Sequence, residues 1–281
     1  MLKIGDICST INETPIFNTP HIHHLFGGEK ENEIILDAQG LFRDLEVILF
    51  PEEIIVIKEI FQNNVYRVST TVYEGTELYL DGRFLLKIDA PSVKSSKHLP
   101  SSIKCSEQLK SLTDHPYLWG GNLPKGIEKM RELYPSKGPL NEQMQRIWSL
   151  IGFDCSGLLY YVTNGITPRN TSQLIEYGQH VDILDKKIDG IIQAVRPLDI
   201  IVWKGHVVII LDRENCIESV VSSGVITSSL KERLEKITET KKAAKVIKSP
   251  EEFVIRRWHP DFLEKDDKKE DHSGIFEFPK E

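Results

Sequence analysis

Cysteine is scarce in this sequence, and its spacing excludes several classes of site. Four cysteines occur among 281 residues, at positions 8, 105, 155 and 216, and no two of them form a CxxC pair. Zinc ribbons and thioredoxin-like redox sites need such pairs, so neither is expected. The start of the chain, MLKIGDICST, lacks the apolar segment and cleavage site of a secretory signal. We therefore expect a cytoplasmic protein with free thiols.

Long apolar runs and an excess of basic residues are also missing. No apolar run approaches the roughly 20 residues of a membrane-spanning helix, so we expect no membrane partner. The formal net charge is −7, which disfavours nucleic acid as a partner. The histidine-rich segment HIHH at 21–24 has no acidic or cysteine ligand nearby, so we expect a surface loop rather than a metal site. No sequence pattern indicates the oligomeric state.

The N-terminal third of the chain reads as short strands separated by turns. The segments EVILF, EEIIVIKEIF and VYRVSTTVY are rich in β-branched and aromatic residues, and residues 62–64 are typical of a hairpin turn. They predict a small all-β barrel within a first domain, residues 1–95. The polar stretch 96–111 is typical of a linker that becomes helical near its end.

A second domain, residues 112–262, mixes helices and strands. Helical segments come first, and DIIVWKGHVVIILD (199–212) then contains two apolar β-rich segments joined by a Lys-Gly turn. Two further strand-like segments, CIESVVSSGVITSS and EEFVIRRW, follow. This order predicts an α+β domain with a mostly antiparallel sheet. The charged segment 263–281 is expected to be a tail.

The segment IGFDCSGLLYYV places a cysteine at the start of a predicted helix. Asp154 is a suitable N-cap, and Gly165 is a suitable C-terminal stop. The helix N-terminus favours a thiolate at Cys155, and its free amides suit an oxyanion. Free cysteine is also a common core residue, so this stretch alone leaves a buried core residue and a nucleophile both open.

A nucleophilic cysteine needs a base, and the base needs a partner that orients it. His206 begins the strand HVVIIL, and Glu218 follows twelve residues later in NCIES. On an adjacent antiparallel strand, the Glu218 carboxylate would reach the imidazole and favour its charged form. A structural histidine and a solvent-facing strand glutamate are the alternatives. Cys216 is expected in the core.

Taken together, the motifs resemble the NlpC/P60 family of cell-wall peptidases. The matching segments occur in family order and are PYLWGG (116–121), GFDCSGLLYY (152–161), TPRNTSQ (167–173), RPLDIIVWKGHVVIIL (196–211) and NCIES (215–219). The resemblance implies a papain-like catalytic domain with Cys155, His206 and Glu218 as catalytic residues and without a cofactor. The preceding β unit is similar to the bacterial SH3 domains often fused to this family.

The resemblance also implies a substrate. The fused, signal-free branch typically cuts peptidoglycan stem peptides, or the murein tripeptides released from them, between γ-D-glutamate and the diamino acid. It requires a free amine on the N-terminal L-alanine, and murein recycling is the implied role. Tyr117 is then expected beside the nucleophile, Asp154, Ser156 and Thr171 around the amine, and Trp119 beside the cleft. Among N-terminal residues, Glu74 and Glu77 are candidates for lining the pocket.

Three departures from the family pattern stand out. Glu218 replaces the usual third-position histidine, and residues 122–151 form a long insert that is expected to cover or restrict the cleft. Leu198 replaces a glycine common in the preceding turn, for which we expect only a local backbone adjustment. Two other functions remain open: a binding module that does not cut peptidoglycan, and an acyltransferase that passes the thioester to an amine.

Overall fold

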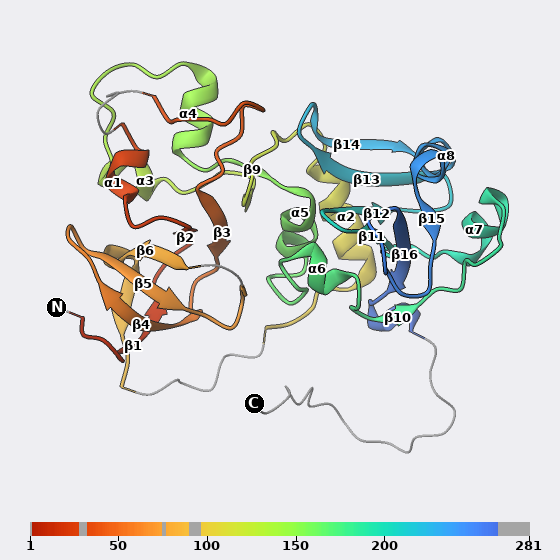
Figure 1. Cartoon of the computed structure of the whole chain (residues 1–281), viewed down its shortest axis with the longest axis horizontal. Coiled ribbons are helices and arrows are strands. Elements are labelled where there is room, and N and C mark those ends of the chain that lie inside the picture. The colour runs from red at the N-terminus through yellow and green to blue at the C-terminus, as the bar shows by residue number, and fades with distance from the viewer. Residues whose placement is uncertain (1, 28–32, 75–76, 90–96, 264–281) are drawn as a thin grey trace.

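The computed structural model describes residues 2–27, 33–74, 77–89 and 97–263 and contains two large antiparallel sheets (Figure 1). An N-terminal sheet lies on one side of the molecule, and a C-terminal sheet with most of the longer helices lies on the other. The α+β class with antiparallel sheets is therefore confirmed. The predicted tail falls outside the described residues, apart from Leu263.

The N-terminal sheet has seven strands in the order β3-β2-β6-β5-β4-β1-β7. Asn63 and Asn64 have φ values of 58° and 63°, as a tight β4–β5 hairpin turn requires. The sequence reading missed the two four-residue strands β1 and β2. The elements are β1 (Ile7–Thr10), β2 (Thr14–Phe17), α1 (Ile22–Leu25), β3 (Leu45–Leu49), β4 (Ile54–Ile60), β5 (Val65–Ser69), β6 (Leu78–Asp81), η1 (Gly82–Phe84) and β7 (Leu85–Lys87).

The sequence predicts a small β-barrel, and among the described residues the strand order does not close on itself; the edge of β3 bonds instead to the Asn122 side chain. The Asn122 side chain donates to the Ile48 carbonyl (3.1 Å) and accepts from the Ile48 amide (3.2 Å). These are the backbone groups that a closing strand would use. The same two bonds fasten the N-terminal sheet to the segment that carries the site.

The remaining elements form the second half of the molecule. They are α2 (Ser102–Ser111), β8 (Asn122–Leu123), α3 (Lys129–Leu133), α4 (Glu142–Trp148), β9 (Gly152–Phe153), α5 (Cys155–Val162), α6 (Thr171–Leu174), β10 (Gln179–His180), α7 (Ile188–Ala194), β11 (Ile200–Trp203), β12 (His206–Ile210), β13 (Asn215–Val220), β14 (Gly224–Ser229), α8 (Leu230–Thr240), β15 (Lys242–Ala243), β16 (Glu252–Arg257) and η2 (Pro260–Phe262). The C-terminal sheet has the order β10-β16-β11-β12-β13-β14, with β15 beside β16.

The central strands of the C-terminal sheet are buried on both faces. Along β12, Val207 and Ile209 pack into the cluster that contains α2 and α5, whereas Val208 and Ile210 pack against α7 and α8. This alternation follows from the two-residue period of a strand. The sheet is thus a rigid layer, and α5 is held against one face of it.

Two segments pack differently from the sequence-based expectation. Most of the predicted linker is helix α2, whose Cys105 and Leu109 are fully buried against α5 and the sheet. The insert does not simply lie over the cleft. Its Tyr134 and Trp148 share a hydrophobic core with Phe26 of the N-terminal half. Both segments carry apolar residues at helical spacing, which stabilise them by burial.

Leu198, in the turn before β11, has the left-handed backbone conformation that glycine adopts without strain. Leu198 has a φ of 67°, and its carbonyl accepts a hydrogen bond from the Trp258 indole (2.7 Å). A left-handed non-glycine residue costs about 1–2 kcal/mol, and burial of the leucine side chain offsets this cost.

Candidate active site

Cys155 is the first residue of α5 and faces a cavity. Asp154 caps the helix by accepting a hydrogen bond from the Gly157 amide at 2.6 Å. Cys155 is only 8% exposed. A β-carbon at Gly157 would lie 2.1 Å from the Gly121 carbonyl oxygen, so only glycine allows α5 to approach the loop that precedes β8 so closely.

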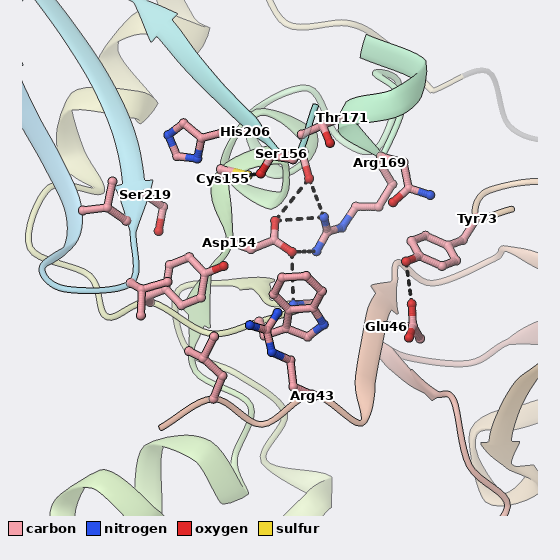
Figure 2. A pocket seen from close by; sticks show the side chains of 18 residues that line it. Arg43, Glu46, Tyr73, Asp154, Cys155, Ser156, Arg169, Thr171, His206 and Ser219 are labelled. Carbon is pink, nitrogen blue, oxygen red and sulfur yellow. Dashed lines mark hydrogen bonds and ion pairs between the residues drawn. The ribbon is translucent and has the colours of Figure 1, made fainter. Parts of the chain in front are cut away.

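The cavity measures about 370 Å³, and both halves of the molecule form its walls (Figure 2). The N-terminal half contributes Leu41, Arg43, Glu46 and Tyr73. The second half contributes Tyr117, Trp119, Gly120, Asp154, Cys155, Ser156, Arg169, Asn170, Thr171, Gly205, His206, Ser219, Val220 and Val221. All the predicted catalytic and substrate-binding residues except Glu218 line this cavity, and Glu218 is bonded to His206.

His206 is held by a buried carboxylate. Its Nε2 lies 2.7 Å from Glu218 Oε2, and Figure 2 shows the imidazole beside Cys155. Because Nε2 bonds to Glu218, Nδ1 is the ring nitrogen left for the thiol. Glu218 is 2% exposed and also accepts a hydrogen bond from Arg233 at 2.8 Å. Burial favours a raised pKa for Glu218, but the bonds from His206 and Arg233 outweigh burial and lower it.

Burial favours the protonated form of the Cys155 thiol. It raises the pKa of the thiol to about 12, and the neighbouring Asp154 charge adds to this, while the Val207 and Ser156 amides oppose it. The Sγ atom points to the Gly205 carbonyl at 4.0 Å, a contact that suits a donating thiol. The prediction that the helix N-terminus would favour a thiolate is therefore wrong, because desolvation of the thiol outweighs the effect of the helix amides on its pKa.

Asp154 has a structural partner that the sequence reading did not identify. Arg169, 2% exposed, donates to both carboxylate oxygens at 2.9 and 2.7 Å. The Gly120 amide adds a bond of 3.1 Å, and the Ser156 hydroxyl also binds this pair. The carboxylate is thus neutralised and surrounded by donors. This arrangement argues against the predicted use of Asp154 and Ser156 as ligands for a substrate amine.

Another carboxylate enters the cavity from the N-terminal half. Glu46 on β3 accepts hydrogen bonds from the Tyr73 hydroxyl (2.6 Å) and the Asn18 side chain (2.9 Å). Both donors are neutral, so the charge of Glu46 is not cancelled by them. Glu74 and Glu77 do not line the cavity, and Glu77 pairs with Tyr79 and Arg67 instead.

The other predicted residues occupy distinct parts of the wall. Burial raises the pKa of Tyr117, so its hydroxyl stays protonated and can donate. Trp119 is 36% exposed, and the Arg43 guanidinium stacks 4.0 Å from its ring centroid. Thr171 begins α6, next to Asn170, which donates across the cleft to the Glu74 carbonyl (3.2 Å).

Sequence reasoning missed Arg169, Arg233 and Glu46. Arg169 lies inside the TPRNTSQ motif, so a search for a cation to match the buried Asp154 would have found it. Arg233 is on α8, a helix that the sequence reading did not separate from its polar surroundings. Glu46 reaches the site only through the contact between the two halves, for which the sequence carries no local signal.

Two further observations describe the surroundings of the site. Within the described ranges, no group of three or more His, Cys, Asp or Glu residues is arranged to hold a metal ion, and the HIHH segment forms α1 and its cap rather than a loop. No helix in the described part of the chain has the length and apolar character needed to cross a membrane.

Comparison with known proteins points to one family. Residues 114–242 match the model of the NlpC/P60 family, so this part of the chain is similar to that family. Members of the family are generally cysteine peptidases or amidases that act on peptidoglycan. No curated protein matches the chain.

Two solved structures show a distant likeness. NlpC2 from Trichomonas vaginalis is 14% identical with a TM-score of 0.34, covering 92% of this chain and 74% of that one. NlpC1 from the same organism is 14% identical with a TM-score of 0.30, covering 92% and 70% respectively.

Proposed function

We propose that this protein is a cysteine peptidase that hydrolyses the γ-D-glutamyl–diamino acid bond of peptidoglycan stem peptides with a free N-terminal L-alanine. The observation that carries the proposal is the line of groups from Cys155 through His206 to Glu218 at one cavity. The match of residues 114–242 to a peptidoglycan-cleaving family supports it. A need for a free amine suits small murein fragments, so we assign the activity to murein recycling.

In the proposed reaction, His206 Nδ1 takes the proton of the Cys155 thiol when substrate is bound. The thiolate attacks the γ-carbonyl of D-glutamate, and amides at the start of α5 together with the Tyr117 hydroxyl stabilise the oxyanion. His206 then protonates the departing amine, which leaves a thioester. A water molecule that loses its proton to His206 hydrolyses the thioester and releases the dipeptide. Glu218 and Arg233 keep the imidazole oriented throughout.

We assign the binding of the substrate amine to Glu46. An ammonium buried in a cavity needs a carboxylate partner. Asp154 is already paired with Arg169, whereas Glu46 is contacted only by the neutral donors Tyr73 and Asn18 among the described residues. Thr171 adds a hydroxyl on the opposite wall of the cavity.

The test is mass spectrometry after incubation with L-Ala-γ-D-Glu-meso-diaminopimelate and with an N-acetylated copy. We expect release of diaminopimelate from the free peptide only, loss of release in Cys155→Ala, and a weakened preference for the free amine in Glu46→Gln. Cleavage of both peptides by the unmodified protein would contradict the amine site. Binding without cleavage would favour the binding module, and new amides formed with added amine acceptors would favour the acyltransferase.

A further inference from the structure

A second cavity adjoins the first, and the proposed reaction gives it no role. It measures about 290 Å³, and its walls are Gln39, Gly40, Leu41, Pro116, Tyr117, Gln143, Arg146, Ile147, Ile151 and Val221. Three of these residues, Leu41, Tyr117 and Val221, also line the cavity that contains Cys155. The second cavity therefore borders the first along these three side chains.

The insert supplies the charge of this second cavity. Helix α4 contributes Gln143, Arg146 and Ile147, and Arg146 is the only charged side chain among the described lining residues. Arg146 pairs with Glu142 at 3.3 Å, but these side chains are 43% and 85% exposed. Such an exposed pair contributes little to stability, so the guanidinium can turn to a ligand at little cost.

The position of His206 shows which part of a substrate would reach this cavity. Figure 2 shows Glu46 and Tyr73 on one side of Cys155, and His206 and Ser219 on the other. The departing amine takes its proton from His206, so the leaving group lies on that side. Strand β13 contains Ser219 and ends at Val220, and the next residue, Val221, lines both cavities.

We propose that the second cavity receives the leaving group and that Arg146 pairs with one of its carboxylates. This inference rests on the proposed function, because it takes the diamino acid as the leaving group. The carboxylate has two possible sources: the C-terminal carboxylate of a tripeptide and the second carboxylate of diaminopimelate. A guanidinium matches either through paired N–H donors.

The test measures binding, so it does not depend on cleavage. The full chain carrying Cys155→Ala is titrated calorimetrically with three tripeptides that end in meso-diaminopimelate, L-lysine or L-lysine amide. These carry two, one and no carboxylates on the terminal residue. Arg146→Gln is expected to weaken binding of the diaminopimelate peptide by roughly tenfold or more, as loss of a hydrogen bond between charged groups does. Arg131→Gln, at an exposed position on α3 of the same insert, is the matched control.

The pattern across the peptides identifies the carboxylate. A loss for the diaminopimelate and lysine peptides, but not for the amide, assigns Arg146 to the C-terminal carboxylate. A loss for the diaminopimelate peptide alone assigns it to the second carboxylate. Equal effects on all three peptides, no effect, or the same effect from Arg131→Gln overturn the proposal. Absence of cleavage by the unmodified chain would instead count against the proposed peptidase.

Discussion

Replacement of Arg169 by methionine tests whether the Asp154–Arg169 pair holds the candidate nucleophile in place. The substitution keeps much of the buried volume but leaves the Asp154 carboxylate with hydroxyl and amide donors alone. Breaking a buried pair in this way costs about 3–5 kcal/mol, because the remaining charge is desolvated without a partner. We therefore expect Arg169→Met to lower the free energy of unfolding by about that amount.

Urea unfolding at neutral pH, followed by circular dichroism, measures this loss. Arg67→Met is the control, because Arg67 and Glu59 form an exposed pair whose removal costs about 0–1 kcal/mol. The double variant Asp154→Asn/Arg169→Met is expected to lose less than Arg169→Met alone, since asparagine still caps α5 and no charge remains unpaired. If Arg169→Met costs no more than the control, the reasoning about the buried pair is refuted.

Three further predictions follow from the site. The rate of alkylation of Cys155 by iodoacetamide should rise about tenfold per pH unit from neutral pH upward, because burial raises the thiol pKa to about 12; a plateau near neutral pH would contradict this. The pKa of Glu218 is held below its ordinary 4.5, so its stabilising contribution is present above pH 4.5 and is lost as pH falls through the lowered value. Urea midpoints of Glu218→Gln should accordingly fall less below pH 4.5 than those of the unmodified chain, and parallel curves would argue against the contribution. Gly157→Ala should lower stability by about 1–3 kcal/mol and abolish cleavage, because the added carbon meets the Gly121 carbonyl at 2.1 Å, while Gly190→Ala on α7 is the well-tolerated control in the same assays.

The sequence predicted those parts of the site that depend on local chemistry. The helix start at Cys155 could be predicted because Asp154 is a cap and Gly165, with a φ of 72°, follows the helix end. The reach of Glu218 to His206 could be predicted because β12 and β13 are adjacent antiparallel strands. Both depend on contacts within short segments, where residue spacing fixes geometry.

The parts that failed depend on contacts between distant segments or on burial. The contact of Asn122 with the edge of β3 could not be predicted, because no local pattern marks it. The predicted charge state of the Cys155 thiol was wrong because the sequence reveals the helix terminus but not how strongly the thiol is desolvated. Glu46 could not be identified because its place in the cavity depends on how the two halves meet.

That meeting of the two halves has an evolutionary consequence. Glu46, Tyr73 and Arg43 shape the cavity from one half, whereas Cys155 and His206 belong to the other. Substitutions at Arg43, Glu46 and Tyr73 would therefore reshape the cavity wall while leaving Cys155 and His206 in place. Under the proposed function, changes in the N-terminal half alone could alter which substrates are accepted.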